Sequence, residues 1–238
     1  MVYDDSLRNQ GLVKSLNWSG YGATANPAAA DTVVTVTGSW TVPAVTSTAP
    51  TGQAAYSAIW VGIDGLDDGT VEQLGTLQAA EVVSAGRGKT ETETAYCAWV
   101  EMYPAPMVEL SGPVEPGDVI TASVTWDGKG TCTLYMRDAT QGWTYGPTKV
   151  AGSSSAEDMS AEWVVEAPSS GSGILPLADF GTVTLTGCSA QIGSIPGFIG
   201  ALPVYDEITM TTANGTVKAQ PSGLNATTDG FSVTWDHD

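Results

Sequence analysis

The chain has 238 residues, and its 26 Asp and Glu against 8 Lys and Arg give a formal net charge of -18. This charge excludes nucleic acid and anionic membrane surfaces as favourable partners. The single histidine, His237, is one residue from the C-terminus. A Ser-His-Asp or Cys-His site, a histidine-ligated metal and a histidine general base are therefore excluded, because each needs an imidazole held in a packed site.

Apolar and polar residues alternate with period two along most of the chain, in runs rich in Val, Thr, Trp and Tyr. This pattern predicts β-strands separated by turns, with almost no amphipathic helix. In chain order, the expected strands cover residues 32–42, 55–63, 71–77, 94–103, 119–126, 131–137, 160–166, 180–185, 207–212, 216–219 and 231–235. We therefore predict an all-β fold, an antiparallel two-sheet β-sandwich of the jelly-roll or concanavalin-like kind.

Three segments between strands have a recognisable character. Residues 127–130, Asp-Gly-Lys-Gly, predict a tight hairpin, because Gly tolerates the positive φ of such turns. Residues 79–94 resemble an insertion that forms either a flap or a hairpin. Residues 192–203, rich in Gly, Pro and apolar side chains, predict an ordered loop that covers part of a sheet.

The chain shows no internal repeat and no linker, so we expect one β-sandwich domain over residues 1–238, with residues 1–16 as an N-terminal extension. The first eleven residues lack the basic-then-apolar pattern of a signal peptide. Few Lys, abundant Thr, Ser and Gly, and eight Trp favour a secreted protein that lacks its signal peptide and any propeptide here. No stretch approaches the roughly 20 apolar residues of a membrane span.

Polar residues interrupt strands that otherwise have a buried character, and these places are the candidates for chemistry. They are residues 60–65 with 71–75, residues 99–104, and residues 161–166. In the last of these, Glu162 and Glu166 share one sheet face because side chains alternate along a strand. A carboxyl group on an aromatic-rich concave face has a raised pKa and can exchange protons in mild acid, since burial disfavours the ionised form.

Six short motifs resemble those of the glutamic peptidases, or eqolisins, in order and spacing. They are Asn-Trp-Ser-Gly-Tyr at 17–21, Trp-Thr-Val-Pro at 40–43, Trp-Val-Gly-Ile-Asp-Gly at 60–65, Gln-x-Gly at 73–75, Trp-x-Glu-x-Tyr-Pro at 99–104 and Ala-Glu-Trp at 161–163. The resemblance covers about residues 17–185. It implies a pepstatin-insensitive acid endopeptidase, a β-sandwich with a concave substrate face, and a Gln and Glu catalytic dyad that needs neither metal nor cofactor.

Motif by motif, the dyad residues implied by the resemblance are Gln73 and Glu162. A carboxylate can take a proton from water as it attacks the scissile carbonyl and return it to the departing amine. A neutral amide can donate its N–H groups to the oxygen that becomes negative in the tetrahedral intermediate. We therefore expect Glu162 to act as general base and then acid, Gln73 to stabilise the oxyanion, and activity to be maximal below pH 5.

The resemblance also implies a substrate cleft. Its expected lining residues are Trp60, Asp64, Trp99, Glu101 and Tyr103, and the last three alternate along one strand so that they share a face. The sequence departs from the family at Cys97, where fungal members carry an aspartate, and at Met102, which replaces a second tryptophan of that strand. These changes alter the local hydrogen bonds and subsites but not the dyad.

Several of these residues also have a purely structural interpretation. Asp64 before a glycine is a common turn former. Glu72 is expected to point to solvent, and a one-residue slip of register would exchange its face with that of Gln73. Cys97 is expected to be a small buried residue, since no histidine is present to activate it. With Cys132 and Cys188, it allows at most one disulfide.

Two other functions fit parts of the pattern. A glycoside hydrolase could use Glu101 with Glu162 or Glu166, if these carboxyls lie about 5 to 9.5 Å apart. A non-catalytic carbohydrate-binding sandwich could use exposed Trp side chains as stacking platforms. Neither explains the order of the six motifs, so we expect a monomeric peptidase whose partners are protein or peptide substrates.

Overall fold

The computed structural model describes residues 11–26, 28, 31–66 and 68–238. Among these residues there is no α-helix, and a short 3-10 turn, η3, covers Ile199–Ala201. The strands are β1 (Leu12–Ser15), β2 (Trp18–Thr24), β3 (Val33–Thr41), β4 (Ala54–Ile63), β5 (Val71–Gly86), β6 (Lys89–Tyr103), β7 (Val108–Glu109), β8 (Val119–Trp126), β9 (Thr131–Asp138), β10 (Thr144–Ala151), β11 (Ser160–Glu166), β12 (Ser169–Ser170), β13 (Gly173–Ile174), β14 (Thr182–Ile192), β15 (Ile195–Phe198), β16 (Tyr205–Thr211), β17 (Val217–Pro221) and β18 (Phe231–Trp235). The all-β prediction is confirmed.

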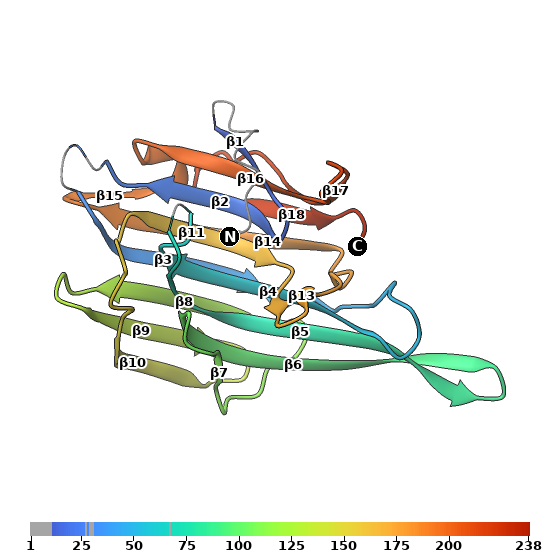
Figure 1. The fold of residues 1–238 in the computed structure, drawn as a ribbon. Coiled ribbons are helices and arrows are strands. Elements are labelled where there is room, and N and C mark those ends of the chain that lie inside the picture. The colour runs from blue at the N-terminus through green and yellow to red at the C-terminus, as the bar shows by residue number, and fades with distance from the viewer. Residues whose placement is uncertain (1–10, 27, 29–30, 67) are drawn as a thin grey trace.

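All eleven strands expected from the sequence are present, with some ends shifted. The hairpin at 127–130 is confirmed, and it joins β8 to β9 with positive φ at Gly128 and Gly130. Residues 79–94 form a hairpin, because β5 and β6 stay paired almost to the turn at their tip, which projects beyond the rest of the sheet (Figure 1). Residues 192–203 are only partly a loop, since β15 pairs with β14 and η3 follows it.

The expected N-terminal extension falls partly outside the described residues, which begin at residue 11. Within it, β1 pairs in parallel with β16, and Val13 lies opposite Ile208. The side chain of Val13 is buried. This part of the extension therefore belongs to the sheet.

All of the strands except β12 and β13 belong to one hydrogen-bonded sheet, and β12 and β13 pair with each other in a separate two-stranded sheet. Along the large sheet the order is β10-β9-β8-β3-β14-β18-β17-β16-β2-β11-β4-β5-β6-β7, with β1 added beside β16 and β15 beside β14. The indole N–H of Trp40 on β3 donates to Thr76 Oγ1 on β5 at 3.0 Å, and that of Trp163 on β11 donates to the Thr37 carbonyl on β3 at 2.8 Å. These strands are distant in the order, so the sheet curls until its halves pack face to face (Figure 1).

Two groups of buried side chains cover the two faces of the β2-β11-β4-β5-β6 half. The main core fills the space between the halves and includes Trp40 and Trp163. The smaller group lies on the opposite face and includes Trp18, Trp60 and Trp99. Strand alternation puts Trp163 in the core and its neighbours on the other face. The second face, with its aromatic floor, carries the candidate site.

Candidate active site

Three polar side chains lie in one row across four neighbouring strands. Glu162 on β11 pairs with Gly62 on β4, Gly62 pairs with Gln73 on β5, and Gln73 pairs with Glu101 on β6. Residues directly opposite one another in a sheet project from the same face. The register therefore places Glu162, Gln73 and Glu101 on the face with the aromatic floor, and it fixes Gln73 rather than Glu72 on that face.

Gly62 separates the two members of the expected dyad and offers no side chain of its own. A Cβ atom built there would lie 2.9 Å from Trp60 Cζ3, 3.1 Å from Val71 Cγ1 and 3.2 Å from Gln73 Cβ. These distances are closer than normal van der Waals contact. Glycine at this position therefore leaves the space over which Glu162 and Gln73 face each other.

We expect Gly62→Ala to fold with a loss of about 1–3 kcal/mol of stability, because the added methyl group overpacks this face. Its larger effect should fall on kcat, since Gln73 must move away from Glu162. Gly171→Ala is the matched control, because a Cβ there meets nothing within 4 Å. Thermal unfolding and peptide cleavage measured on both variants check this, and unchanged kcat in Gly62→Ala would contradict the proximity of the two side chains.

The amide of Gln73 is held by Glu101. Gln73 is 5% exposed, and its Nε2 donates to Glu101 Oε2 at 2.7 Å. Burial raises the pKa of Glu101, and the hydrogen bond from Gln73 acts in the opposite direction because it stabilises the ionised form. Gln73 Oε1 is buried and has no hydrogen-bond partner among the described residues. The contact with Glu101 therefore fixes the Gln73 amide with its Nε2 towards Glu101.

Glu162 is fully buried. Neither of its carboxyl oxygens has a hydrogen-bond partner within the described ranges. Burial raises its pKa well above the ordinary value, and the charge of Asp64 adds to the effect. Leu66 packs over Gly22, the residue opposite Glu162 on β2. The carboxyl group is thus isolated from bulk water at one end of the row.

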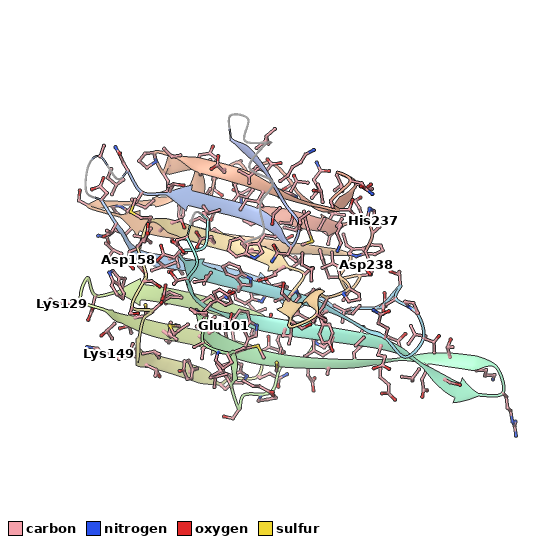
Figure 2. The ribbon with its side chains drawn as sticks, in the orientation of Figure 1. Glu101, Lys129, Lys149, Asp158, His237 and Asp238 are labelled. Atoms are coloured by element: carbon pink, nitrogen blue, oxygen red, sulfur yellow. The ribbon has the colours of Figure 1, made fainter. Side chains whose placement is uncertain are left out.

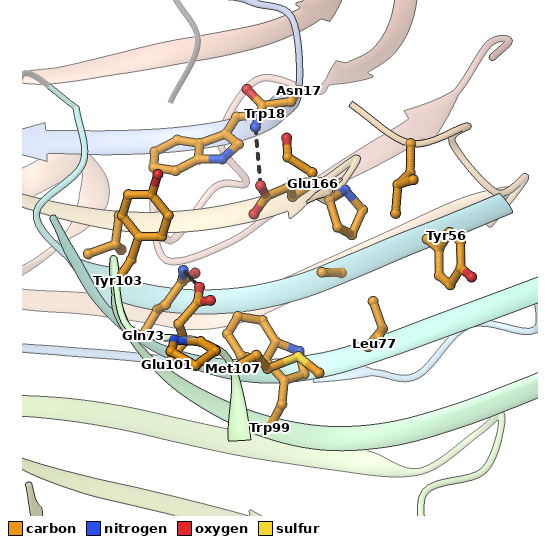
Figure 3. Close-up of a pocket in the computed structure, with 16 residues that line it drawn as sticks. Asn17, Trp18, Tyr56, Gln73, Leu77, Trp99, Glu101, Tyr103, Met107 and Glu166 are labelled. Carbon is orange, nitrogen blue, oxygen red and sulfur yellow. Dashed lines mark hydrogen bonds between the residues drawn. The ribbon is translucent and has the colours of Figure 1, made fainter. Parts of the chain in front are cut away.

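A cavity of about 610 Å³ opens on the same face (Figure 3). Its lining residues are Asn17, Trp18, Tyr56, Ala58, Val71, Gln73, Leu77, Trp99, Glu101, Tyr103, Pro106, Met107, Glu166, Pro168, Ser169 and Leu175. Of the residues expected from the sequence, Gln73, Trp99, Glu101 and Tyr103 line it, whereas Glu162, Trp60 and Asp64 do not. The cavity has an apolar, aromatic wall with a few polar groups, which is typical of ligand sites.

Trp60 and Asp64 lie beside the cavity and hold its surroundings. Trp60 packs edge-on against Trp18, with ring centroids 4.8 Å apart, and its Nε1 donates to Glu166 Oε2 at 2.8 Å. The buried carboxylate of Asp64 accepts hydrogen bonds from the backbone N–H groups of Glu157, Asp158 and Met159 at 2.7–2.9 Å. Asp64 also has a positive φ of 71°, as expected of a turn residue. Its contacts tie down the segment that leads into β11 and Glu162.

Trp18 and Glu166 also line the cavity, although the sequence analysis names neither among the expected cleft residues. The alternation that places Glu162 on this face also places Glu166 there, four residues further along β11. That pattern was therefore sufficient to find Glu166. Trp18 could not be found in this way, because its contact with Trp60 depends on how β2 docks beside β11.

The prediction that Glu72 points to solvent is wrong. Glu72 is 1% exposed, and its Oε1 accepts a hydrogen bond from the Ser153 N–H at 2.8 Å. Both faces of β5 are covered here, so the face opposite Gln73 is also buried. Together with Asp64 and Asp158, which are buried as well, Glu72 forms what we call the acid cluster. Burial, followed by repulsion from the other carboxylates, raises the pKa of Glu72 and of Asp158 to about 7.

Neither the cysteines nor His237 are among the residues that line the cavity. Cys97, Cys132 and Cys188 are unbridged, and burial raises the pKa of the Cys97 thiol to about 11, as expected of an inert thiol. Figure 2 shows His237 at the C-terminal end, separated from Glu101. Across the described ranges, no group of three His, Cys, Asp or Glu could hold a metal ion. Nor does that part of the chain contain a helix long and apolar enough to cross a membrane.

The chain belongs to the Peptidase A4 family, whose model matches residues 16–230. Among curated proteins it is similar to aspergillopepsin-2 of Aspergillus niger, with 28% identity over an alignment of 200 residues that covers 75% of this chain. The match spans 65% of the length of that relative. The resemblance to glutamic peptidases seen in the sequence motifs is confirmed.

Solved structures of glutamic peptidases share the fold. Scytalido-glutamic peptidase with a peptide-based transition state analogue superposes with a TM-score of 0.70 at 21% identity, covering 93% of this chain and 99% of that one. SCP-B, an eqolisin in complex with the tripeptide Ala-Ile-His, gives the same values. Aspergilloglutamic peptidase from Aspergillus niger gives a TM-score of 0.59 at 26% identity, covering 76% of this chain and 99% of that one.

Proposed function

We propose that the protein is an acid endopeptidase in which Glu162 activates a water molecule and Gln73 stabilises the oxyanion. The observation that supports this most directly is the row on β11, β4 and β5, where only Gly62 separates the two side chains. Family membership makes peptide-bond hydrolysis the expected reaction. Family membership also favours the peptidase over the glycoside hydrolase and the carbohydrate-binding sandwich.

The side chains can carry out both halves of the reaction. Glu162 takes a proton from water as the water oxygen bonds to the scissile carbonyl carbon, and returns that proton to the amide nitrogen as the C–N bond breaks. Gln73 has two N–H groups. One donates to Glu101, which leaves the other for the oxygen that becomes negative. The buried oxygens of Glu162 and Gln73 Oε1 are acceptors suited to orienting the attacking water.

We propose an acid optimum because of the ionisation of Glu162 itself and of the acid cluster. Glu162 must be ionised to act as a base; burial raises its pKa, whereas hydrogen bonds from water and substrate favour the ionised form. At higher pH, the acid cluster ionises and its carboxylates repel one another next to the segment before β11. This loosens the position of Glu162, so we propose that activity falls as pH rises through about 6 to 7. The maximum below about pH 5 is proposed from the resemblance to acid endopeptidases.

Substrate peptides are proposed to bind along the cavity. Trp99 and Tyr103 offer aromatic surface there, and Glu101 contributes a carboxyl group beside Gln73. Trp60 and Asp64 are proposed to support the cleft from behind, since neither reaches the cavity. The peptide ligands in the structures of scytalido-glutamic peptidase and SCP-B are consistent with such use of this fold.

The setting of the enzyme is proposed from the sequence. A single domain, secretion, a monomeric state, and the absence of nucleic-acid and membrane partners all fit the acidic composition and the Thr-, Ser- and Gly-rich strands. The concave face of a two-layered sandwich is proposed as the substrate face, because the cavity lies on the aromatic side of one half of the curled sheet.

The proposal is tested by the cleavage of a denatured protein across pH 2 to 8, with and without pepstatin. We expect cleavage that peaks below about pH 5 and that pepstatin leaves unchanged. The products should be internal fragments, which separates an endopeptidase from an exopeptidase. Maximal cleavage at pH 7 to 8, or no cleavage at any pH, would contradict the proposal.

A further inference from the structure

Glu166 is a carboxyl group in the cavity that the proposed reaction does not use. It lies four residues after Glu162 on β11 and on the same face, which places the two about 13 Å apart along the strand. Glu101 comes from β6, with β4 and β5 between it and Glu166. Figure 3 shows Glu166 across the cavity from Trp99 and Glu101. Glu166 is therefore placed to contact substrate residues that lie away from the scissile bond.

Hydrogen-bond donors surround Glu166. Asn17 Nδ2 donates to its Oε1 at 3.1 Å, and Trp60 Nε1 donates to its Oε2 at 2.8 Å. Trp18 also lines the cavity beside Glu166 and packs against Trp60. A carboxylate has about four lone-pair sites, and the Asn17 and Trp60 donors hold one on each oxygen. Because Glu166 lines the cavity, its remaining sites are available to a bound ligand.

Among the described residues, the other titratable groups lining the cavity are Glu101, Tyr56 and Tyr103, and none of the lining residues is Lys, Arg or His. No described residue that lines the cavity therefore offers a cation to an ionised Glu166. Burial is the largest influence on Glu166 and raises its pKa to about 7 despite the donors, and the charge of Glu101 acts in the same direction. In the acid range of the proposed enzyme, Glu166 is thus a neutral carboxyl group whose proton occupies one of the remaining sites.

We propose that Glu166 is a substrate-binding residue that donates its carboxyl proton to a carbonyl oxygen of the bound peptide. The inference rests on the proposed peptidase function. Asn17 and Trp60 each hold one oxygen of the carboxyl group and so fix its orientation towards the cavity. When Glu166 ionises, a lone pair faces the substrate carbonyl instead, and the peptide binds less tightly.

The test measures peptide binding separately from chemistry. A rhodamine-labelled peptide that the wild type cleaves is titrated by fluorescence anisotropy into Glu162→Gln, which is expected to bind without turnover. Between pH 5 and pH 7.5, we expect Kd to rise about fourfold, as a single group titrating near pH 7 dictates. Glutamine mimics the protonated carboxyl, so adding Glu166→Gln should keep Kd low and independent of pH. Adding Glu166→Ala should give weak binding at both pH values.

Glu115→Gln is the matched control, because Glu115 is an exposed carboxyl outside the cavity. It should reproduce the pH dependence of the parent. Parallel pH curves for the parent and Glu166→Gln, or tight binding by Glu166→Ala at pH 5, would overturn the inference. Cleavage of the same peptide by the wild type is measured alongside. Absence of cleavage by the wild type would contradict the peptidase proposal. Cleavage by the wild type together with pH-independent binding by the Glu162→Gln parent would contradict only the role of Glu166.

Discussion

Glu162→Gln should lower kcat by about 10²–10⁴ with little change in KM, because it removes a general base and leaves the cavity walls intact. Gln73→Ala should lower kcat by about 10²–10³ through the loss of an oxyanion donor. The two groups hold the same water, so the double variant should lose much less than the product of the single effects. Steady-state kinetics at the pH optimum, on one peptide, gives all four values.

Folding must be separated from catalysis in these variants. Glutamine keeps the volume of Glu162 and carries no charge into a buried site, so Glu162→Gln should be at least as stable as the wild type. Circular dichroism and thermal unfolding check this. A folded Glu162→Gln that retains activity would show that another carboxyl group is the base, and fully multiplicative effects would show that the two residues act independently.

The second large effect is a loss of stability as pH rises to neutral. Asp64, Glu72 and Asp158 have pKa values of about 6, 7 and 7 in the folded protein, whereas unfolded carboxyls titrate near 4. Folding therefore favours their protonated forms. That contribution is complete below about pH 4 and is lost as pH rises through 6 to 7. Each unit of raised pKa corresponds to about 1.4 kcal/mol, so Tm should be highest in acid.

Two substitutions should make the protein more stable near neutral pH. Glu72→Gln keeps an oxygen to accept from the Ser153 N–H, and Asp158→Asn suits the positive φ of 57° at that position. Together they should raise Tm at pH 7 and leave it nearly unchanged at pH 4. Asp127→Asn is the control, since Asp127 is exposed and its hydrogen bonds lower its pKa. A wild-type Tm that rises from pH 4 to 7 would contradict this account.

The local residue pattern predicted most strands well. It did not predict strands that form only because they pair with distant segments. The Val- and Thr-rich alternation of β8 and β9 defines those strands without tertiary context. By contrast, β2 is rich in Gly and Ser, and it is a strand because it docks between β11 and β16. A Cβ at Gly20 would lie 2.1 Å from the Trp163 carbonyl oxygen, so the close approach of β2 requires this glycine. Such contacts between distant segments are not encoded in a local window.

The candidate site shows the same division. Alternation and the family motifs predicted that Gln73, Glu101 and Glu162 share one face. The burial of Glu72 was missed, because alternation predicts which face a side chain takes and not whether the second face is covered. The backbone contacts of Asp64 with residues 157–159 join segments more than ninety positions apart. Those contacts depend on the tertiary fold. The sequence could not show them, and the family motif alone placed Asp64 in the cleft.

Of the three carboxyl groups on the aromatic face, we propose that Glu162 is the base. This proposal is tested most directly by kcat for Glu101→Gln, Glu162→Gln and Glu166→Gln, measured on one peptide at the pH optimum. We expect kcat to fall by about 10²–10⁴ in Glu162→Gln and by tenfold or less in each of the other two variants. A retained kcat in Glu162→Gln, with the large loss at Glu101 or Glu166, would contradict the proposal.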